Sequence, residues 1–367
     1  MNRIYADYNA TTPLDPAVLE AMLPYLRDQF GNASSAHFFG RDARAAIDDA
    51  RVRIARQLGA QESEIVFTGG GTESDNTVIF GVRPGHIITS AIEHHAILHA
   101  CRQRGDCETT YLPVDKDCRV APGDLQRALR ADTVLVSIMS ANNETGTCQP
   151  ISELAAICRD RGIPFHTDAV QSYGKQKVNV NEWGVDLLSL SAHKFYGPKG
   201  SGLLYIRRGI KLDPLLFGGS HENERRAGTE NVAGIVGLAR AMELPVVDLF
   251  DLTEQLASGI AARITGASRN GHAALRAGNT VNFSFAGCET SGLLLGLDLE
   301  GVAASSGSAC AVGSLEPSHV LTAMGLSREL ARAAVRFSFG KSSVLSDVET
   351  ILTALERVVP RLRQFAR

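Results

Sequence analysis

Between residues 64 and 208, short apolar runs alternate with helix-like stretches, and this alternation limits the fold more than any other feature of the chain. The apolar runs cover residues 64–69, 86–92, 109–114, 133–140, 164–170, 187–193 and 202–208. Strands that alternate with helices form a mostly parallel sheet, because each parallel connection needs a helical crossover that covers one face. The pattern therefore predicts an α/β fold with a seven-stranded, mostly parallel sheet.

The pattern changes near residue 248. Further elements are predicted at 251–266 (helix), 279–286 (strand), 327–340 (helix running into strand) and 346–365 (amphipathic helix). We expect an N-terminal arm over 1–15, a large domain over 16–248 and a smaller C-terminal α/β domain over 249–367. Two domains also agree with a length of 367 residues.

The composition excludes several classes of protein. Thirty-seven Lys and Arg against 40 Asp and Glu give no support for a nucleic-acid partner. The chain has no apolar run long enough to span a bilayer and no signal-peptide core at its start. Its seven cysteines include no C-x-x-C pair, which predicts reduced thiols in a cytoplasmic protein and no bound metal.

Polar residues follow the predicted strands, where ligands of α/β sheets bind. Gly71 and Thr72 lie in a glycine-rich turn (67–76) whose backbone N–H groups suit a phosphate, with Thr72 expected to cap the next helix. An ordinary strand-to-helix turn is the alternative interpretation. Lys194 follows an apolar strand, as Schiff-base lysines do, with Ser191 and His193 beside it. A lysine extending to solvent from a strand end is the alternative.

Three further positions suggest chemistry. Asp168 ends a strand with Gln171 three residues on, so the carboxylate could pair with a cation or cap a helix. His94 follows another strand and could stack on a ring or transfer a proton. His95 and His99 have a metal-ligand spacing, but no acidic or cysteine ligand accompanies them.

Asn143 also follows a strand and offers an amide donor. Arg336 enters an apolar strand and could clamp a carboxylate, or pair with a local Asp or Glu. Cys310 lies among Ser, Gly and Ala in a loop at about 305–317. A cysteine there could be reactive, a disulfide partner, a metal ligand or without function.

The order of these clusters resembles that of pyridoxal-phosphate enzymes with the aspartate-aminotransferase fold (fold type I). The motifs DYNATTP, TGGGTESDN, EHHAIL, ANNETG, HTDAVQSYG, SAHKFYGPKG, RAGTEN and SSGSAC…SLEPSHVL are similar to those of the NifS/IscS-like cysteine desulfurases of the class V aminotransferase family. The match is to the group with a long, mobile cysteine loop, and it covers essentially the whole chain. SHENER replaces a run that is glycine-rich in many members.

The resemblance implies a role for each matching residue. Lys194 would bind pyridoxal 5'-phosphate as a Schiff base, Asp168 would hold the pyridinium nitrogen, and His94 would stack on the ring. Gln171 would reach the phenolic oxygen. The phosphate would be bound by Gly71, Thr72, Ser191, His193 and, from a second subunit, Thr229.

The resemblance also implies the reaction. Asn143 and Arg336 would bind the carboxylate of L-cysteine, and Cys310 would take the sulfur as a persulfide while L-alanine leaves. The sulfur would pass from a cytoplasmic homodimer to an acceptor protein for iron–sulfur cluster synthesis or another sulfur-containing product. A selenocysteine lyase, or another pyridoxal-phosphate lyase or aminotransferase of this fold, is the alternative.

Overall fold

The structure is a computed structural model of the chain and describes residues 3–307 and 316–365. Its larger sheet has seven strands in the order β2-β8-β7-β6-β5-β3-β4. The strands are β2 (Ile65–Thr68), β3 (Gly85–Ser90), β4 (Cys107–Leu112), β5 (Thr133–Ser137), β6 (Phe165–Asp168), β7 (Leu187–Ser191) and β8 (Gly202–Ile206). All pairs are parallel except those of β8, which runs antiparallel to β2 and β7. The predicted seven-stranded, mostly parallel sheet is confirmed.

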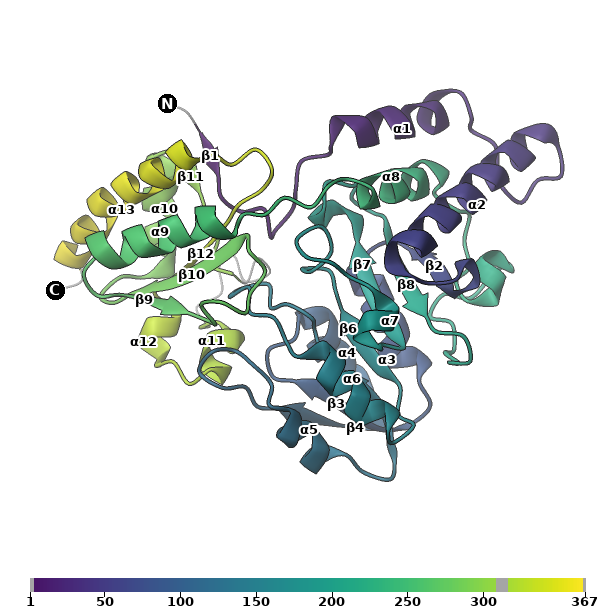
Figure 1. The fold of residues 1–367 in the computed structure, drawn as a ribbon, viewed down its shortest axis with the longest axis horizontal. Helices are drawn as coiled ribbons and strands as arrows, with labels where there is room; N and C mark the ends of the chain where they lie inside the picture. The colour runs from purple at the N-terminus through teal and green to yellow at the C-terminus, as the bar shows by residue number, and fades with distance from the viewer. Residues whose placement is uncertain (1–2, 308–315, 366–367) are drawn as a thin grey trace.

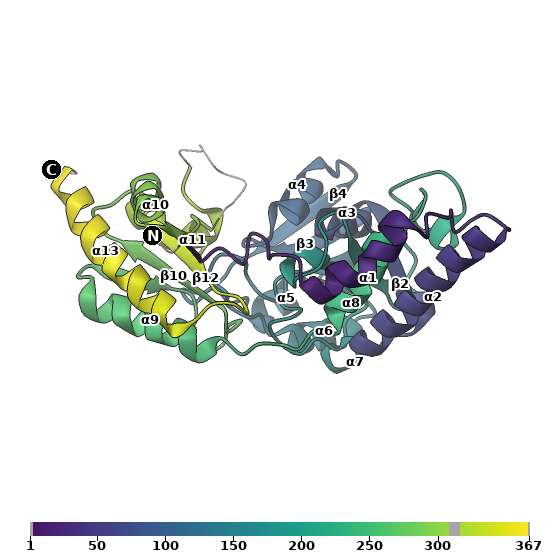
Figure 2. The same cartoon turned by 90° about the horizontal axis from the view of Figure 1, so that it is seen from above.

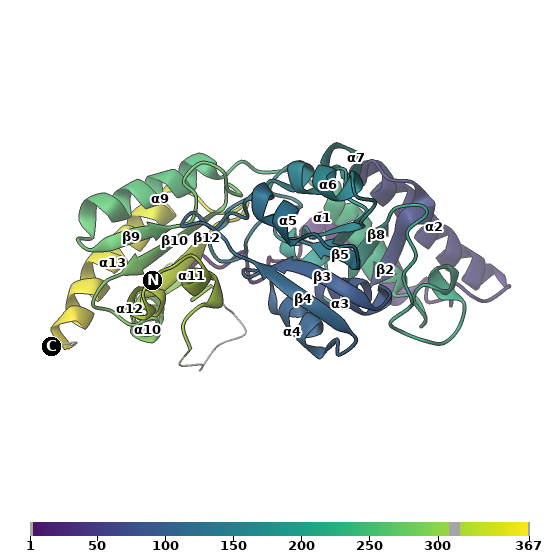
Figure 3. The same ribbon diagram turned by 90° about the horizontal axis from the view of Figure 1, so that it is seen from below.

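Helices cover both faces of this sheet, as Figures 2 and 3 show. On one face α3 (Gly71–Gly81) and α4 (His95–Gln103) share an apolar core with alternate strand residues such as Val66. The opposite face packs against α1 (Pro16–Arg27), α2 (Phe38–Leu58), α5 (Pro122–Ala128), α6 (Ile151–Arg159), α7 (Val180–Trp183) and α8 (Val232–Met242). Ile65 and Phe67 point to that core, because successive strand side chains alternate between faces.

A second sheet follows in the C-terminal part. It is antiparallel, with β10 (Thr280–Phe285) between β12 (Ala334–Ser338) and β9 (Ala267–Asn270). It shares one apolar core with α9 (Phe250–Arg263), α10 (Thr290–Leu299) and α13 (Leu345–Phe365). Two short helices, α11 (His319–Ala323) and α12 (Arg328–Ala331), complete this part. The smaller C-terminal α/β unit is as expected, whereas the boundaries at residues 15 and 248 stay predictions.

The N-terminal arm contacts both parts of the molecule (Figure 1). Its strand β1 (Ile4–Tyr5) pairs in parallel with β11 (Val302–Ala303). Further along, the backbone N–H of Asn9 donates to Ser338 Oγ (3.0 Å), and that of Thr12 donates to the His193 carbonyl (2.9 Å). The arm therefore crosses between the two sheets close to the end of β7.

One predicted helix start is wrong. Gly70, rather than Thr72, is the N-cap of α3, and it has φ 149°, a value that favours glycine. Thr72 is consequently the second residue of the helix, and the first N–H groups of the helix belong to the glycine turn. None of the helices in the described residues is long and apolar enough to cross a membrane.

Candidate active site

A cavity of about 300 Å³ lies beyond the carboxyl ends of β6 and β7. Most of the residues predicted for the site line it: Gly71, Thr72, His94, Asn143, Asp168, Gln171, Ser191, His193, Lys194 and Arg336. Its size suits a small ligand. Strand ends from the large sheet and Arg336 from the small sheet thus meet at one place, although Arg336 is far from the others in the chain.

Lys194 lies one turn beyond β7, in the short 3-10 helix Ala192–Lys194. Its Nζ donates to the carbonyl oxygens of Asn9 (2.6 Å) and Ala10 (2.9 Å) in the N-terminal arm. The amine therefore lies on the cavity wall rather than in solvent. This position suits a lysine that bonds covalently to a ligand aldehyde.

Asp168 ends β6 as a buried carboxyl. Burial raises its pKa to about 6, against the opposing effects of the Val170 N–H (2.9 Å from Oδ1) and of Lys194. Asp75 faces the same cavity, and its buried Oδ1 has no hydrogen-bond partner in the described part of the chain. Burial, and then Asp168, raise the pKa of Asp75. His166 Nε2 lies 3.8 Å from Asp75 Oδ1, but burial lowers the pKa of His166 to about 3, so its ring is neutral. Among the described residues, neither carboxyl therefore has a hydrogen bond from a cationic N–H, which a pyridinium would supply.

His94 is the N-cap of α4, and its Nδ1 accepts a hydrogen bond from the Ala96 N–H at 3.2 Å. Burial lowers the pKa of His94 to about 4, and Lys194 acts in the same direction. The ring is therefore neutral near pH 7. Because Nδ1 is the acceptor in this bond, the ring proton is assigned to Nε2.

The glycine turn before α3 forms an open cradle next to Ser191 and His193. Residues 69–72 border an adjoining hollow together with these two side chains. A Cβ at Gly71 would lie 2.9 Å from Val170 Cγ2, so glycine keeps this approach clear. The N-terminus of an 11-residue helix also carries partial positive charge. The cradle consequently suits a phosphate.

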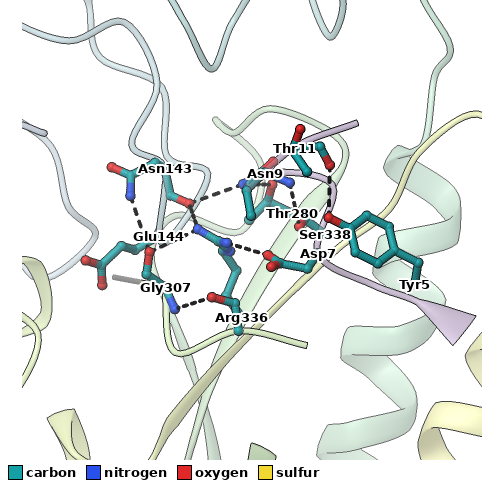
Figure 4. A network of polar contacts seen from close by, with 12 residues as sticks. Tyr5, Asp7, Asn9, Thr11, Asn143, Glu144, Thr280, Gly307, Arg336 and Ser338 are labelled. Atoms are coloured by element: carbon teal, nitrogen blue, oxygen red, sulfur yellow. Dashed lines mark hydrogen bonds and ion pairs between the residues drawn. The ribbon is translucent and has the colours of Figure 1, made fainter. Parts of the chain in front are cut away.

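Arg336 is held at the centre of a polar network (Figure 4). Its Nη1 donates to the carbonyl oxygens of Asn143 (2.9 Å) and Gly307 (3.0 Å), and its Nη2 pairs with Asp7 Oδ1 at 2.5 Å. The alternative interpretation, an ion pair with an acidic residue, is met by Asp7, whereas the carboxylate clamp stays a prediction. The buried Nε has no hydrogen-bond partner among residues 3–307 and 316–365.

Sequence reasoning missed Asn9, which connects the site to the small sheet. Its carbonyl accepts from Gln171 Nε2 (3.1 Å) and from Lys194, and its Oδ1 accepts from Lys175 Nζ (2.9 Å). Its Nδ2 donates to Thr280 Oγ1 (2.8 Å). Asn9 follows no predicted strand, so only its place in the DYNATTP motif could have indicated it.

One predicted residue, Thr229, does not line this cavity, and a second, Cys310, cannot be placed relative to it because the structure does not describe that stretch. Thr229 is exposed and borders a separate hollow with Gly69 and Arg226. Cys310 lies outside the described residues, and Gly307 and His319, on either side of that stretch, both line the cavity. In the described ranges, no group of three His, Cys, Asp or Glu side chains could hold a metal ion.

The donors present fit pyridoxal phosphate. They include a cavity-facing amine, a buried carboxyl with no hydrogen bond from a cationic N–H in the described part of the chain, and a glycine cradle that a Cβ would obstruct. The fold and the site together define a pyridoxal-phosphate-dependent enzyme of fold type I.

Comparison with known proteins identifies the family. The model for "Aminotransferase class-V" matches residues 4–351. The cysteine desulfurase IscS of Dictyoglomus turgidum is 52% identical, over 98% of this chain and 95% of the relative. A solved structure described as a NifS-like protein superposes with a TM-score of 0.91 at 37% identity, covering 98% of this chain and all of its own. A solved structure described as SspA in complex with cysteine superposes with a TM-score of 0.83 at 38% identity, covering 93% of this chain and all of its own. The chain belongs to the class-V aminotransferase family, and within it to the cysteine desulfurases.

Proposed function

We propose that this enzyme converts L-cysteine to L-alanine and transfers the sulfur to Cys310 as a persulfide. The observation that carries the proposal is the convergence of Lys194, Asp168 and Arg336 on one cavity. Amino-acid chemistry with pyridoxal phosphate needs an amine that binds the cofactor, a carboxylate that pairs with the ring nitrogen and a cation that binds the substrate carboxylate. The identity to cysteine desulfurases supports the choice of substrate.

Pyridoxal phosphate, when bound, supplies an electron sink for negative charge at the substrate Cα. We assign its ring nitrogen to Asp168, its ring face to His94 and its phenolic oxygen to Gln171. The phosphate-binding residues of the same chain are Gly71, Thr72, Ser191 and His193. Because these groups lie on separate elements around one cavity, they can fix the ring in a single orientation.

The substrate carboxylate would bind the free Nε of Arg336 and the amide of Asn143. Arg336 is already fixed by two carbonyls and Asp7, so little side-chain freedom is lost on binding. Lys194 Nζ would then take the Cα proton and hold it. His94, which carries its ring proton on Nε2, would donate that proton to the substrate. The thiolate of Cys310 would attack the substrate sulfur, so that the Cβ–S bond breaks and a persulfide forms.

We further propose a homodimer in which Thr229 completes the phosphate site of the partner subunit. Thr229 is exposed and does not line the cavity that Lys194 faces in its own chain. Large apolar side chains are exposed on α1, on the first turn of α2, between these helices and in the segment before Thr229. They are Leu19, Leu23, Leu26, Phe30, Phe38, Phe39 and Phe217. A second subunit could cover such a surface.

The sulfur acceptor would be another protein, which makes iron–sulfur clusters or other sulfur-containing products. Glu316, next to the stretch that contains Cys310, has a side chain that is 78% exposed, so a partner could approach there. We propose a cytoplasmic location, since all six cysteines in the described ranges are free thiols.

The test compares Lys194→Ala, Cys310→Ala and, as a control, Cys107→Ala, whose thiol is half-buried away from the cavity. Alanine and sulfide released from L-cysteine would be measured with a thiol reductant present. We expect Cys107→Ala to match the wild type, Lys194→Ala to lose both products, and Cys310→Ala to lose about 100-fold or more of the rate. Sulfide release at the full rate by Cys310→Ala would contradict the assigned acceptor.

A further inference from the structure

Lys175 is a second lysine that binds Asn9, and the proposed function gives it no role. It is a partly buried residue in the turns that follow β6. Its Nζ donates to Asn9 Oδ1 (2.9 Å) and to Gln171 Oε1 (2.5 Å). No Asp or Glu carboxylate in the described ranges pairs with it. A lysine charge held inside a protein without a carboxylate partner is unfavourable, and such groups are candidates for a functional site.

The groups around Lys175 make its positive charge still less favourable. Burial has the largest effect and lowers the pKa of Lys175. Lys194, which follows β7, and Arg336, in β12, lower this pKa further, whereas the Cys148 thiol raises it. Both of these cations line the cavity. A negatively charged group of a ligand in that cavity is therefore the partner that the described residues do not supply.

The bond to Lys175 sets the orientation of the Gln171 side chain. An ammonium can only donate, so the amide oxygen Oε1 faces Lys175. On the other side of the amide, Nε2 donates to the Asn9 carbonyl at 3.1 Å, and a carbonyl oxygen can only accept. Both neighbours therefore require the same amide orientation. Nε2 carries a second N–H, and Gln171 lines the cavity, so this N–H can donate to a ligand there.

We propose that Lys175 is a positioning residue, which fixes the Gln171 amide as a hydrogen-bond donor and stabilises negative charge on the oxygen that accepts this bond. The inference rests on the proposed function, which assigns the phenolic oxygen of pyridoxal phosphate to Gln171. Because linked hydrogen bonds polarise one another, the cation behind the amide makes its N–H a stronger donor. Lys175 thus serves the phenolic oxygen as Asp168 serves the ring nitrogen, since each is a charge whose partner is the ligand.

The test compares Lys175→Met, which removes the charge at similar length, with Lys175→Arg, which keeps it. Asn9 Oδ1 has a second donor, Asn279 Nδ2 at 2.9 Å, so the N-terminal arm should stay in place in Lys175→Met. Lys177→Met is the matched control, because Lys177 is exposed two residues further along the chain and pairs with Glu182.

The first measurement is a pH titration of the absorbance of the bound cofactor in each protein. A proton added to the cofactor brings positive charge, which a nearby cation opposes. We expect Lys175→Met to raise the midpoint pH of the absorbance change by about one pH unit or more. Lys175→Arg should lie closer to the wild type, and Lys177→Met should match it.

The second measurement is a double-mutant cycle with Gln171→Ala, which separates positioning from a general effect on stability. Binding of pyridoxal phosphate would be measured by absorbance titration of the four cofactor-free proteins. We expect Lys175→Met to weaken binding about 10-fold when Gln171 is present and to have little effect in the Gln171→Ala background. Equal losses in both backgrounds, or a wild-type midpoint pH in Lys175→Met, would overturn the proposal. A wild type that binds pyridoxal phosphate but releases no alanine from L-cysteine would instead refute the proposed function.

Discussion

At the scale of single residues, Asp168 combines a functional and a destabilising effect. The carboxyl is buried, which raises its pKa, and the Val170 N–H and Lys194 offset that rise only in part. The charge that would hold a pyridinium is therefore unfavourable in the cofactor-free protein. Binding sites commonly contain such groups, because the ligand supplies the missing partner.

The pH dependence of stability should reveal this cost. The pKa of Asp168 is raised from 3.8 to about 6 on folding, so the folded state binds the proton more tightly than the unfolded chain. Its relative stability consequently falls as pH rises from 3.8 to about 6, and stays low above that pH. Asp168→Asn has no such proton to lose and keeps an acceptor for the Val170 N–H. Without cofactor, its free energy of unfolding near pH 7 should be about 2–3 kcal/mol larger than that of the wild type.

Chemical denaturation of the cofactor-free proteins near pH 4 and pH 7 would measure this difference. Asp160→Asn, at an exposed position after α6, is the matched control and should change little at either pH. The same Asp168→Asn protein should lose desulfurase activity when cofactor is added. A destabilised Asp168→Asn protein at pH 7 would show that the carboxylate has a favourable partner in the empty site.

At the scale of elements, the strands of the large sheet could be predicted, and the residues at their ends with them. Asp168 ends β6 and Lys194 follows β7, so the rule that ligands bind at strand ends was enough to predict that both residues line one cavity, while their roles stay predictions. Asn9 and Asp7 come from an arm with almost no regular structure, and His319 from a helix of five residues. Their positions depend on long-range contacts that no local pattern encodes.

The start of α3 gives a prediction at this scale. In Gly71→Ala the new Cβ would lie 2.9 Å from Val170 Cγ2, so the turn or the Val170 side chain would have to shift to relieve the contact. Binding of pyridoxal phosphate would need the turn in its original place, against an overpacking cost of about 1–3 kcal/mol, which corresponds to about 5- to 150-fold weaker binding. Absorbance titration of the cofactor-free protein would measure it. Gly105→Ala, whose Cβ would meet nothing within 4 Å, should bind normally.

At the scale of the whole molecule, the N-terminal arm makes the cavity depend on both sheets. Asn9 accepts from Lys194 and Lys175 on one side and donates to Thr280 and Ser338 on the other. Arg336 reaches Asn143 across the same boundary. The large part alone would therefore lack the carboxylate clamp, and the small part alone would lack the lysine.

The proposed dimer extends this dependence to a second chain, and mixing two inactive variants tests it. Lys194→Ala lacks the reactive amine, and Thr229→Ala lacks the hydroxyl that we assign to the partner's phosphate site. In a mixed dimer, the site with Lys194 from the Thr229→Ala chain would receive Thr229 from the Lys194→Ala chain. One complete site per mixed dimer should therefore form, and random mixing should restore about one quarter of the wild-type activity.

The control mixes Lys194→Ala with Asp168→Asn, two residues that line one cavity within a single chain. No mixed dimer of that pair can assemble a complete site, so activity should not return. Subunit exchange would be verified by native mass spectrometry before activity is measured. If Thr229 instead served its own chain, the first mixture would also stay inactive, because the Thr229→Ala chain would carry its defect into the only site with a lysine. Recovery in the first mixture alone would place Thr229 at the partner's cofactor.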